Sequence, residues 1–175
     1  VGSDESRMAK LSVSSDQCGI SVKNIFQGEW KGSDMSGPGG GQKLNLLKEH
    51  IFYLPDHDVV LFTDAYDVFY YRNLNDILGR FLGFKSEVVF SAEQFLWPDQ
   101  SLRFPPTHTK YRYLNSGTFI GRVGELKRML SEVIEDSDDD QLYLQKCFLS
   151  GRYDAVLDTE GYIFQTHDPD AVVLN

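Results

Sequence analysis

Hydrophobic residues along the chain follow two patterns, one of buried strands and one of amphipathic helices. The clearest strand is at residues 58–63, where Val59, Val60, Leu61 and Phe62 form an uninterrupted apolar run, as in a strand covered on both faces. Residues 42–50 instead bring Leu44, Leu47 and Ile51 to one helical face. The same patterns predict helices at 4–17, 74–84, 125–134 and 139–149, and strands at 20–26, 87–91, 113–121, 155–157 and 162–164.

Strands that alternate with helices predict an α/β domain in which helices flank a mostly parallel sheet. In such a sheet, ligands collect beyond the carboxyl ends of the strands. A chain of 175 residues is long enough for one domain of this kind, and it has no apolar run of the length that spans a membrane. We therefore expect a single domain over residues 1–175. The opening Val1-Gly2-Ser3 does not resemble a natural start, so we expect a fragment of a longer protein.

The charge balance argues against two classes of partner. The chain has 17 basic and 26 acidic residues, a formal net charge of −9. Such a surface repels nucleic acid and anionic lipid, because both are bound through Lys and Arg contacts with phosphate. An acidic protein can still hold a diphosphate when a divalent cation lies between the two. The two cysteines, Cys18 and Cys147, are too few for a disulfide framework and show no zinc-ligand spacing.

The segment Asp64-Ala65-Tyr66-Asp67 follows the clearest strand and is the main candidate for chemistry. Two carboxylates in one small volume repel each other, and a hard divalent cation relieves that repulsion while keeping coordination sites for phosphate oxygens. One alternative is a strand-ending turn in which Asp64 caps the next element. Another is the nucleophilic aspartate of a phosphatase, which the spacing of the pair disfavours.

Two further segments lie next to predicted helices. The run Gly39-Gly40-Gly41-Gln42-Lys43 can present bare backbone N–H groups and a cation to an anion, although a flexible loop is the alternative. The acidic residues 136–140 precede the helix at 139–149. Their alternative interpretation is favourable charge at a helix N-terminus, and a calcium loop is disfavoured because the glycine and the terminal glutamate are out of register.

Three other positions could contact a ligand. Trp97, in the long loop at 95–111, can stack on a sugar or a base, or can cover the edge of the core. The polar and small residues 115–117 interrupt a strand, either for close approach of a ligand or as a bulge. His167 could offer a metal ligand or simply be solvated.

These segments occur in an order that resembles one family, the N-terminal glycosyltransferase domain of the procollagen-lysine 2-oxoglutarate 5-dioxygenases, or multifunctional lysyl hydroxylases. The resemblance runs from about Trp30 to the end of the chain. The matching segments are Gly39-Gly40-Gly41-Gln42-Lys43, Phe62-Thr63-Asp64-Ala65-Tyr66-Asp67-Val68, Phe90-Ser91-Ala92-Glu93, Trp97-Pro98, residues 113–121, Asp138-Asp139-Asp140-Gln141-Leu142 and Ile163-Phe164-Gln165.

The resemblance implies a GT-A, Rossmann-like fold and Mn²⁺-dependent use of a UDP-sugar. Members transfer glucose from UDP-glucose to galactosyl-hydroxylysine of collagen, and some transfer galactose to hydroxylysine. A collagen acceptor, a homodimeric parent protein and the endoplasmic reticulum lumen or secretory pathway follow as expectations. The iron, 2-oxoglutarate and ascorbate of the family belong to a hydroxylase domain that this sequence does not contain.

Carried over by position, Asp64 and Asp67 match the metal-binding pair of the family, and Asp64 also lies at the donor. Tyr66 matches a nucleotide contact, Lys43 the lysine near the diphosphate, and Trp97 the loop tryptophan near the donor.

The resemblance also assigns an acceptor-side wall to four residues, Glu93, Asn115, Asp139 and Asp140, of which the acidic pair is required for transfer. The third metal ligand of the family is a histidine in a His-Gly-Asn-Gly stretch, which this sequence lacks. A catalytically degenerate scaffold or collagen-recognition module is therefore the alternative to an active transferase.

Overall fold

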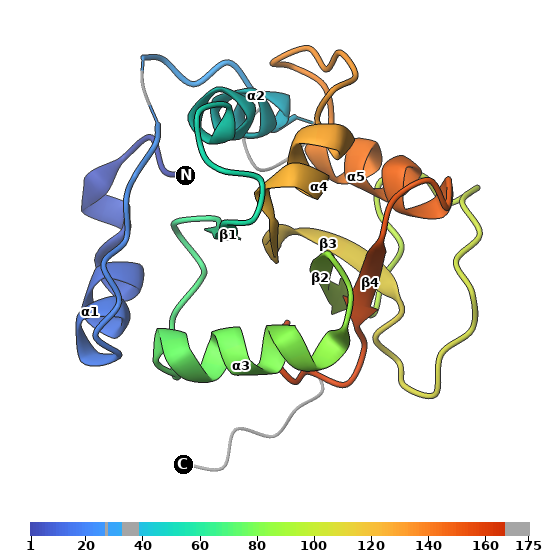
Figure 1. Ribbon diagram of the computed structural model, residues 1–175. Helices are drawn as coiled ribbons and strands as arrows, with labels where there is room; N and C mark the ends of the chain where they lie inside the picture. Colours follow the sequence, from blue (N-terminus) through green and yellow to red (C-terminus); the bar gives the residue numbers. More distant parts are fainter. Residues whose placement is uncertain (27, 33–38, 167–175) are drawn as a thin grey trace.

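The computed structural model describes residues 1–26, 28–32 and 39–166. One four-stranded sheet forms the middle layer, and helices lie above and below it (Figure 1). The strands are β1 (Val59–Thr63), β2 (Val88–Glu93), β3 (Tyr113–Arg122) and β4 (Ala155–Asp158), and their spatial order is β1-β3-β2-β4. The expected α/β architecture with flanking helices is confirmed.

The expectation of a mostly parallel sheet was wrong for the described strands. β3 lies between β1 and β2 and runs antiparallel to both, and only β2 and β4 pair in parallel. The reason is the long connection between β2 and β3, which brings the chain back into the sheet at the end where β2 stops. Continuous burial predicts a strand that is covered on both faces, but it does not determine the direction of that strand.

Successive residues of the central strands face opposite layers. In β2, Val88 and Phe90 belong to the core on one face, and Val89 belongs to the core on the other. β3 divides Phe119 and Ile120 in the same way. Because both faces are covered, the segments at residues 88–90 and 119–120 have no polar side to show in the sequence, which explains why they are hydrophobic without alternation.

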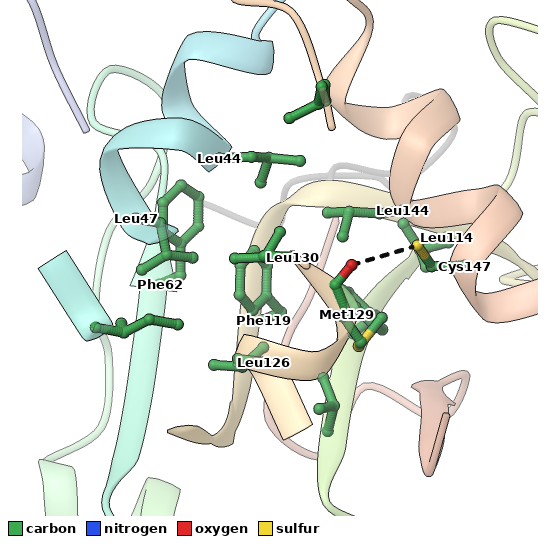
Figure 2. Packing of buried hydrophobic residues seen from close by; sticks show 14 of the residues in the cluster. Leu44, Leu47, Phe62, Leu114, Phe119, Leu126, Met129, Leu130, Leu144 and Cys147 are labelled. Carbon is green, nitrogen blue, oxygen red and sulfur yellow. Dashed lines mark hydrogen bonds between the residues drawn. The ribbon is translucent and has the colours of Figure 1, made fainter. Parts of the chain in front are cut away.

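Three helices, α2 (Gly41–Ile51), α4 (Val123–Met129) and α5 (Asp140–Leu149), cover the first face. Figure 2 shows their leucines converging on the rings of Phe62 and Phe119, which are stacked with centroids 4.7 Å apart. Cys147 of α5 lies in this core, with its Sγ 3.9 Å from the carbonyl oxygen of Met129. Both cysteines are free thiols.

The opposite face is covered by α3 (Leu74–Phe84), which packs Ile77 and Phe81 against the sheet. The helix begins at Asn73, whose side-chain oxygen accepts a hydrogen bond from the Asp76 N–H at 3.0 Å. Among the described residues, no helix is long and apolar enough to cross a membrane.

Four elements differ from their predicted form. Residues 4–17 divide into a short 3₁₀ turn, η1 (Glu5–Arg7), and α1 (Ala9–Gln17). The helix expected at 125–134 begins earlier and ends at Met129. Residues 20–26 and 162–164 are not strands.

In both failed strands, side chains take up the backbone donors that a sheet would use. The carboxylate of Asp158 accepts hydrogen bonds from the N–H groups of residues 162, 163 and 164 at 2.8, 2.6 and 2.8 Å. In the N-terminal segment, the side-chain oxygen of Asn24 accepts from the N–H of Phe26 at 3.1 Å. These local bonds compete with strand pairing, and hydrophobic alternation does not reveal them.

We predict that Leu126→Ala destabilises the domain by about 2–5 kcal/mol, because Leu126 is only 2% exposed and its loss leaves a cavity in the first core. Leu82→Ala is the matched control, since Leu82 is 54% exposed and its loss should change stability by less than about 0.5 kcal/mol. Urea unfolding measures both variants. Equal effects of the two substitutions would contradict the described packing.

Candidate functional site

A cavity of about 600 Å³ opens where β1 and β2 end. Because β3 is antiparallel to both, its amino-terminal half supplies the adjoining wall. The polar side chains around the cavity include Asp64 and Asp67 after β1, Glu93 at the end of β2, Asn115 in β3 and Gln141 at the start of α5. The structure therefore brings five acidic and amide residues from separate parts of the chain to one cavity.

Asp64 is fixed against a bulge in β3. Its N–H donates to the carbonyl of Gly117 at 2.7 Å. The pairing between β2 and β3 shifts register here, since Phe90 faces Phe119 while the next residue, Ser91, faces Asn115. A Cβ atom on Gly117 would meet Asp64 Oδ2 at 3.2 Å. The bulge interpretation of residues 115–117 is confirmed, and Gly117 lets the Asp64 carboxylate come close; the approach of a ligand at this segment stays a prediction.

The Lys43 ammonium joins Asp64 to Asp140. Lys43 Nζ lies 3.0 and 3.1 Å from the two carboxylate oxygens of Asp64 and 3.0 Å from Asp140 Oδ2. Burial alone would lower the pKa of Lys43, but the two carboxylates outweigh it and raise the pKa. Burial also raises the pKa of Asp64, with the neighbouring Asp140 adding to the rise and Lys43 opposing it. The site therefore contains a charged lysine whose partners are two carboxylates from different elements.

The glycine run serves close packing within the protein. Gly40 has φ +106°, and a Cβ on it would overlap the Asp140 carboxylate, while a Cβ on Gly41 would overlap the carbonyl of Glu135. The N–H groups of Gly41 and Gln42 donate to carbonyls of the acidic loop, at residues 138 and 136, over 2.9 and 3.0 Å. These two donors are occupied, so the interpretation that they face an anion was wrong. Residues 33–38, which precede the glycine run, lie outside the described residues.

The two acidic residues at the start of α5 have different surroundings. Asp139 caps the helix, since its Oδ1 accepts from the Leu142 N–H at 2.7 Å. Burial raises the pKa of Asp139. Asp140 is buried and pairs with Lys43. Neither residue lines the cavity. The interpretation of the acidic cluster as favourable charge at a helix N-terminus therefore holds for both residues, and Asp140 also joins the site through Lys43.

Glu93 is the carboxylate on the wall opposite the aspartate pair. Burial raises its pKa, and hydrogen bonds from Gln141 and Asn115 oppose the rise. Gln141 Nε2 donates to Glu93 Oε1 at 2.8 Å. Gln141 belongs to the family-matching segment at residues 138–142, but the sequence analysis assigned it no role in the site.

Tyr66 and Trp97 do not line the cavity. The Tyr66 hydroxyl lies 2.7 and 2.8 Å from the N–H groups of Ser3 and Asp4, and the Arg7 guanidinium lies 4.2 Å from its ring centroid. Trp97 is 53% exposed, while its backbone carbonyl is bonded to α5.

Only part of a cation site is present. Among the described residues, no group of three or more His, Cys, Asp and Glu side chains could hold a metal ion. Asp64 and Asp67 nevertheless line one cavity, and carboxylate oxygens are the ligands that hard divalent cations take. Such a pair fits a cation that completes its coordination with water and with the oxygens of a bound diphosphate. His167 lies outside the described residues.

The chain is similar to collagen-modifying proteins. It is 42% identical over 156 residues to the procollagen-lysine,2-oxoglutarate 5-dioxygenase of Drosophila melanogaster, which covers 83% of this chain and 22% of the relative. It is 39% identical over 156 residues to the human procollagen-lysine,2-oxoglutarate 5-dioxygenase 2, and the match covers 83% of this chain and 21% of the relative. Uncharacterized protein R699 of Acanthamoeba polyphaga mimivirus is 38% identical over 142 residues, and the match covers 78% of this chain and 31% of the relative.

The chain thus spans about a fifth to a third of the length of these relatives. The sequence model of the PLOD GT domain matches residues 3–171, which is nearly the whole chain. The mixed α/β architecture, with helices on both faces of one sheet, agrees with a GT-A-like fold. On these grounds the chain belongs to the PLOD GT domain family.

Proposed function

We propose that this domain binds a UDP-sugar through a divalent cation and transfers the sugar to hydroxylysine or galactosyl-hydroxylysine of collagen. Glucose is the first candidate for the transferred sugar, and galactose is the second. The observation that carries the proposal is the position of Asp64 and Asp67 on one cavity at the end of β1, with Lys43 bonded to Asp64 from behind the cavity lining. Membership of the family and the names of the relatives support the reaction and its acceptor.

Charge explains why a cation is needed. A protein of net charge −9 repels a diphosphate, and the aspartate pair increases that repulsion locally. Mn²⁺ held by Asp64 and Asp67 would reverse it and supply the Lewis acidity that stabilises negative charge on the departing UDP. Lys43 is the residue of this chain that adds to the effect, because its raised pKa keeps it charged at neutral pH.

On the acceptor side, Glu93 is the carboxylate that lies in the cavity, and Asn115 lies next to it. Since burial raises the pKa of Glu93, this carboxylate is suited to hydrogen-bond an acceptor hydroxyl and to take its proton. Asp140 then acts by holding Lys43, and Asp139 by fixing the start of α5. Trp97 and Tyr66 would contact the donor after the segments around them move. A secretory-pathway location and a homodimeric parent are part of the same proposal.

The second candidate is a non-catalytic scaffold that recognises collagen for a neighbouring hydroxylase. It is favoured by one observation, that no third acidic, histidine or cysteine ligand accompanies the aspartate pair within the described residues. A scaffold of this kind need bind neither Mn²⁺ nor UDP. Calorimetric titration with both ligands separates the two candidates, because the transferase requires joint binding.

We predict that Asp64→Asn and Asp67→Asn each weaken Mn²⁺-dependent UDP binding at least about tenfold, because each removes one anionic ligand from the cation. Asp16→Asn is the control, since Asp16 is an exposed aspartate of α1 outside the cavity. Isothermal titration with UDP, with and without Mn²⁺, measures the effect. Unchanged affinity in both cavity variants would defeat the metal assignment.

We also predict that Lys43→Met lowers sugar transfer by about 10²-fold, because it removes a cation from the departing diphosphate. The same change should destabilise the fold by about 3 kcal/mol at pH 7, since Asp64 and Asp140 keep their negative charges without a partner. Lys48→Met on the same helix is the control. UDP release and urea unfolding measure the two effects.

The stability loss in Lys43→Met should depend on pH. Burial raises the pKa of Asp64, and removal of Lys43 raises it further. A carboxyl group whose folded pKa exceeds its unfolded pKa favours folding when it is protonated. The loss should therefore be largest at neutral pH and shrink as the pH falls through the raised pKa of Asp64. A loss that grows on acidification would show that the lysine does not compensate these carboxylates.

A further inference from the structure

We infer that Gln141 is a positioning residue that ties the Glu93 carboxylate and the Trp97 segment to α5, and that Gln145 is its structural anchor. The inference rests on the proposed function in one respect, that Glu93 faces the acceptor. Its geometric basis, a shared set of hydrogen bonds, stands independently of the identity of the sugar.

The two glutamines act on one atom. They lie four residues apart on α5 and so project from the same side of the helix. Gln141 Nε2 and Gln145 Nε2 both donate to the carbonyl oxygen of Trp97, each at 2.9 Å. A carbonyl oxygen has two lone pairs, so both bonds can form at once. The backbone at Trp97 is thereby held to α5 by two side chains.

The remaining N–H of each amide reaches a different part of the sheet. Gln141 Nε2 donates to Glu93 Oε1 at 2.8 Å, and Gln145 Nε2 donates to the carbonyl of Leu114 at 3.1 Å. Gln141 Oε1 accepts from the Ser116 N–H at 3.2 Å. Turning the Gln141 amide over would set its NH₂ against the Ser116 N–H and its oxygen against the Glu93 carboxylate and the Trp97 carbonyl. The surroundings therefore select one orientation of the amide.

Burial distinguishes the two residues. Gln145 is fully buried, and its bonds connect α5 with β3 and the loop inside the protein. Gln141 lines the cavity, and it alone of the pair contacts Glu93. A displacement of the Trp97 carbonyl consequently strains the same amide that orients Glu93. The Trp97 segment and the Glu93 carboxylate of the cavity are thus coupled through one side chain.

The test uses Gln141→Leu, which keeps the approximate volume of the side chain and removes both donors, and Gln141→Glu, which keeps the shape and sets a carboxylate against Glu93 and the Trp97 carbonyl. The exposed Gln17→Leu on α1 is the control. All variants carry Trp30→Phe, because the sequence has two tryptophans and Trp97 then becomes the sole tryptophan, which excitation at 295 nm selects over the tyrosines.

The first readout is acrylamide quenching and anisotropy of Trp97 fluorescence. Both Gln141 variants should raise the quenching constant and lower the anisotropy, while Gln17→Leu leaves them unchanged. The second readout is steady-state transfer in the full-length parent protein. The KM for the collagen acceptor should rise at least about tenfold, as the loss of one charge-assisted hydrogen bond implies, while the KM for the UDP-sugar stays the same.

The outcomes separate the claims. Unchanged Trp97 fluorescence in both Gln141 variants would overturn the inference, and so would an equal rise of the KM for donor and acceptor, which indicates general disruption. If the unmutated parent transfers no sugar, the proposed function fails, and the fluorescence result still decides whether Gln141 holds the Trp97 segment.

Discussion

The site depends on the ion pairs that Lys43 makes with Asp64 and Asp140. Three chain segments meet at this ammonium: the first turn of α2, the end of β1 and the first residue of α5. Two buried carboxylates could not share this volume without a cation between them. The lysine therefore does at the inner side of the site what a bound cation would do at the outer side, where Asp67 is exposed to solvent. The lysine compensates Asp64, and a cation bound on the cavity side would compensate the same carboxylate.

Close approach of the backbone makes this arrangement sterically possible. Gly40 and Gly41 let the start of α2 lie directly against the acidic loop, and Gly117 lets Asp64 lie against the bulge of β3. A side chain at any of these positions would push apart segments that the ion pairs hold together. The ion pairs of Lys43 thus depend on the close approach that these glycines allow. The glycine run serves packing within the protein and not the binding of an anion.

The first helix-covered face of the sheet supports the polar site. α5 inserts Leu144 and Cys147 into the core shown in Figure 2, and the adjoining side of the helix carries the glutamines that bind the loop after β2. Because the helix is fixed by apolar packing, its polar side chains are held at defined distances from β2 and β3. The apolar packing of α5 against the sheet therefore fixes the positions from which its glutamines make their hydrogen bonds.

The amino-acid sequence by itself determined the α/β class, the main helices and strands, the Asp64 and Asp67 pair after β1 and, through the ordered motifs, the family. Periodicity and residue order carry that information because they are local. Only the tertiary structure decided that β3 runs antiparallel, that Asp158 and Asn24 replace strand pairing with side-chain bonds, and that Gln141 joins Glu93 to Trp97. It also decided that Asp139 caps a helix while Asp140 pairs with Lys43. These features depend on which distant segments meet, and strand direction, bulges and shared hydrogen bonds leave no periodic trace in a sequence.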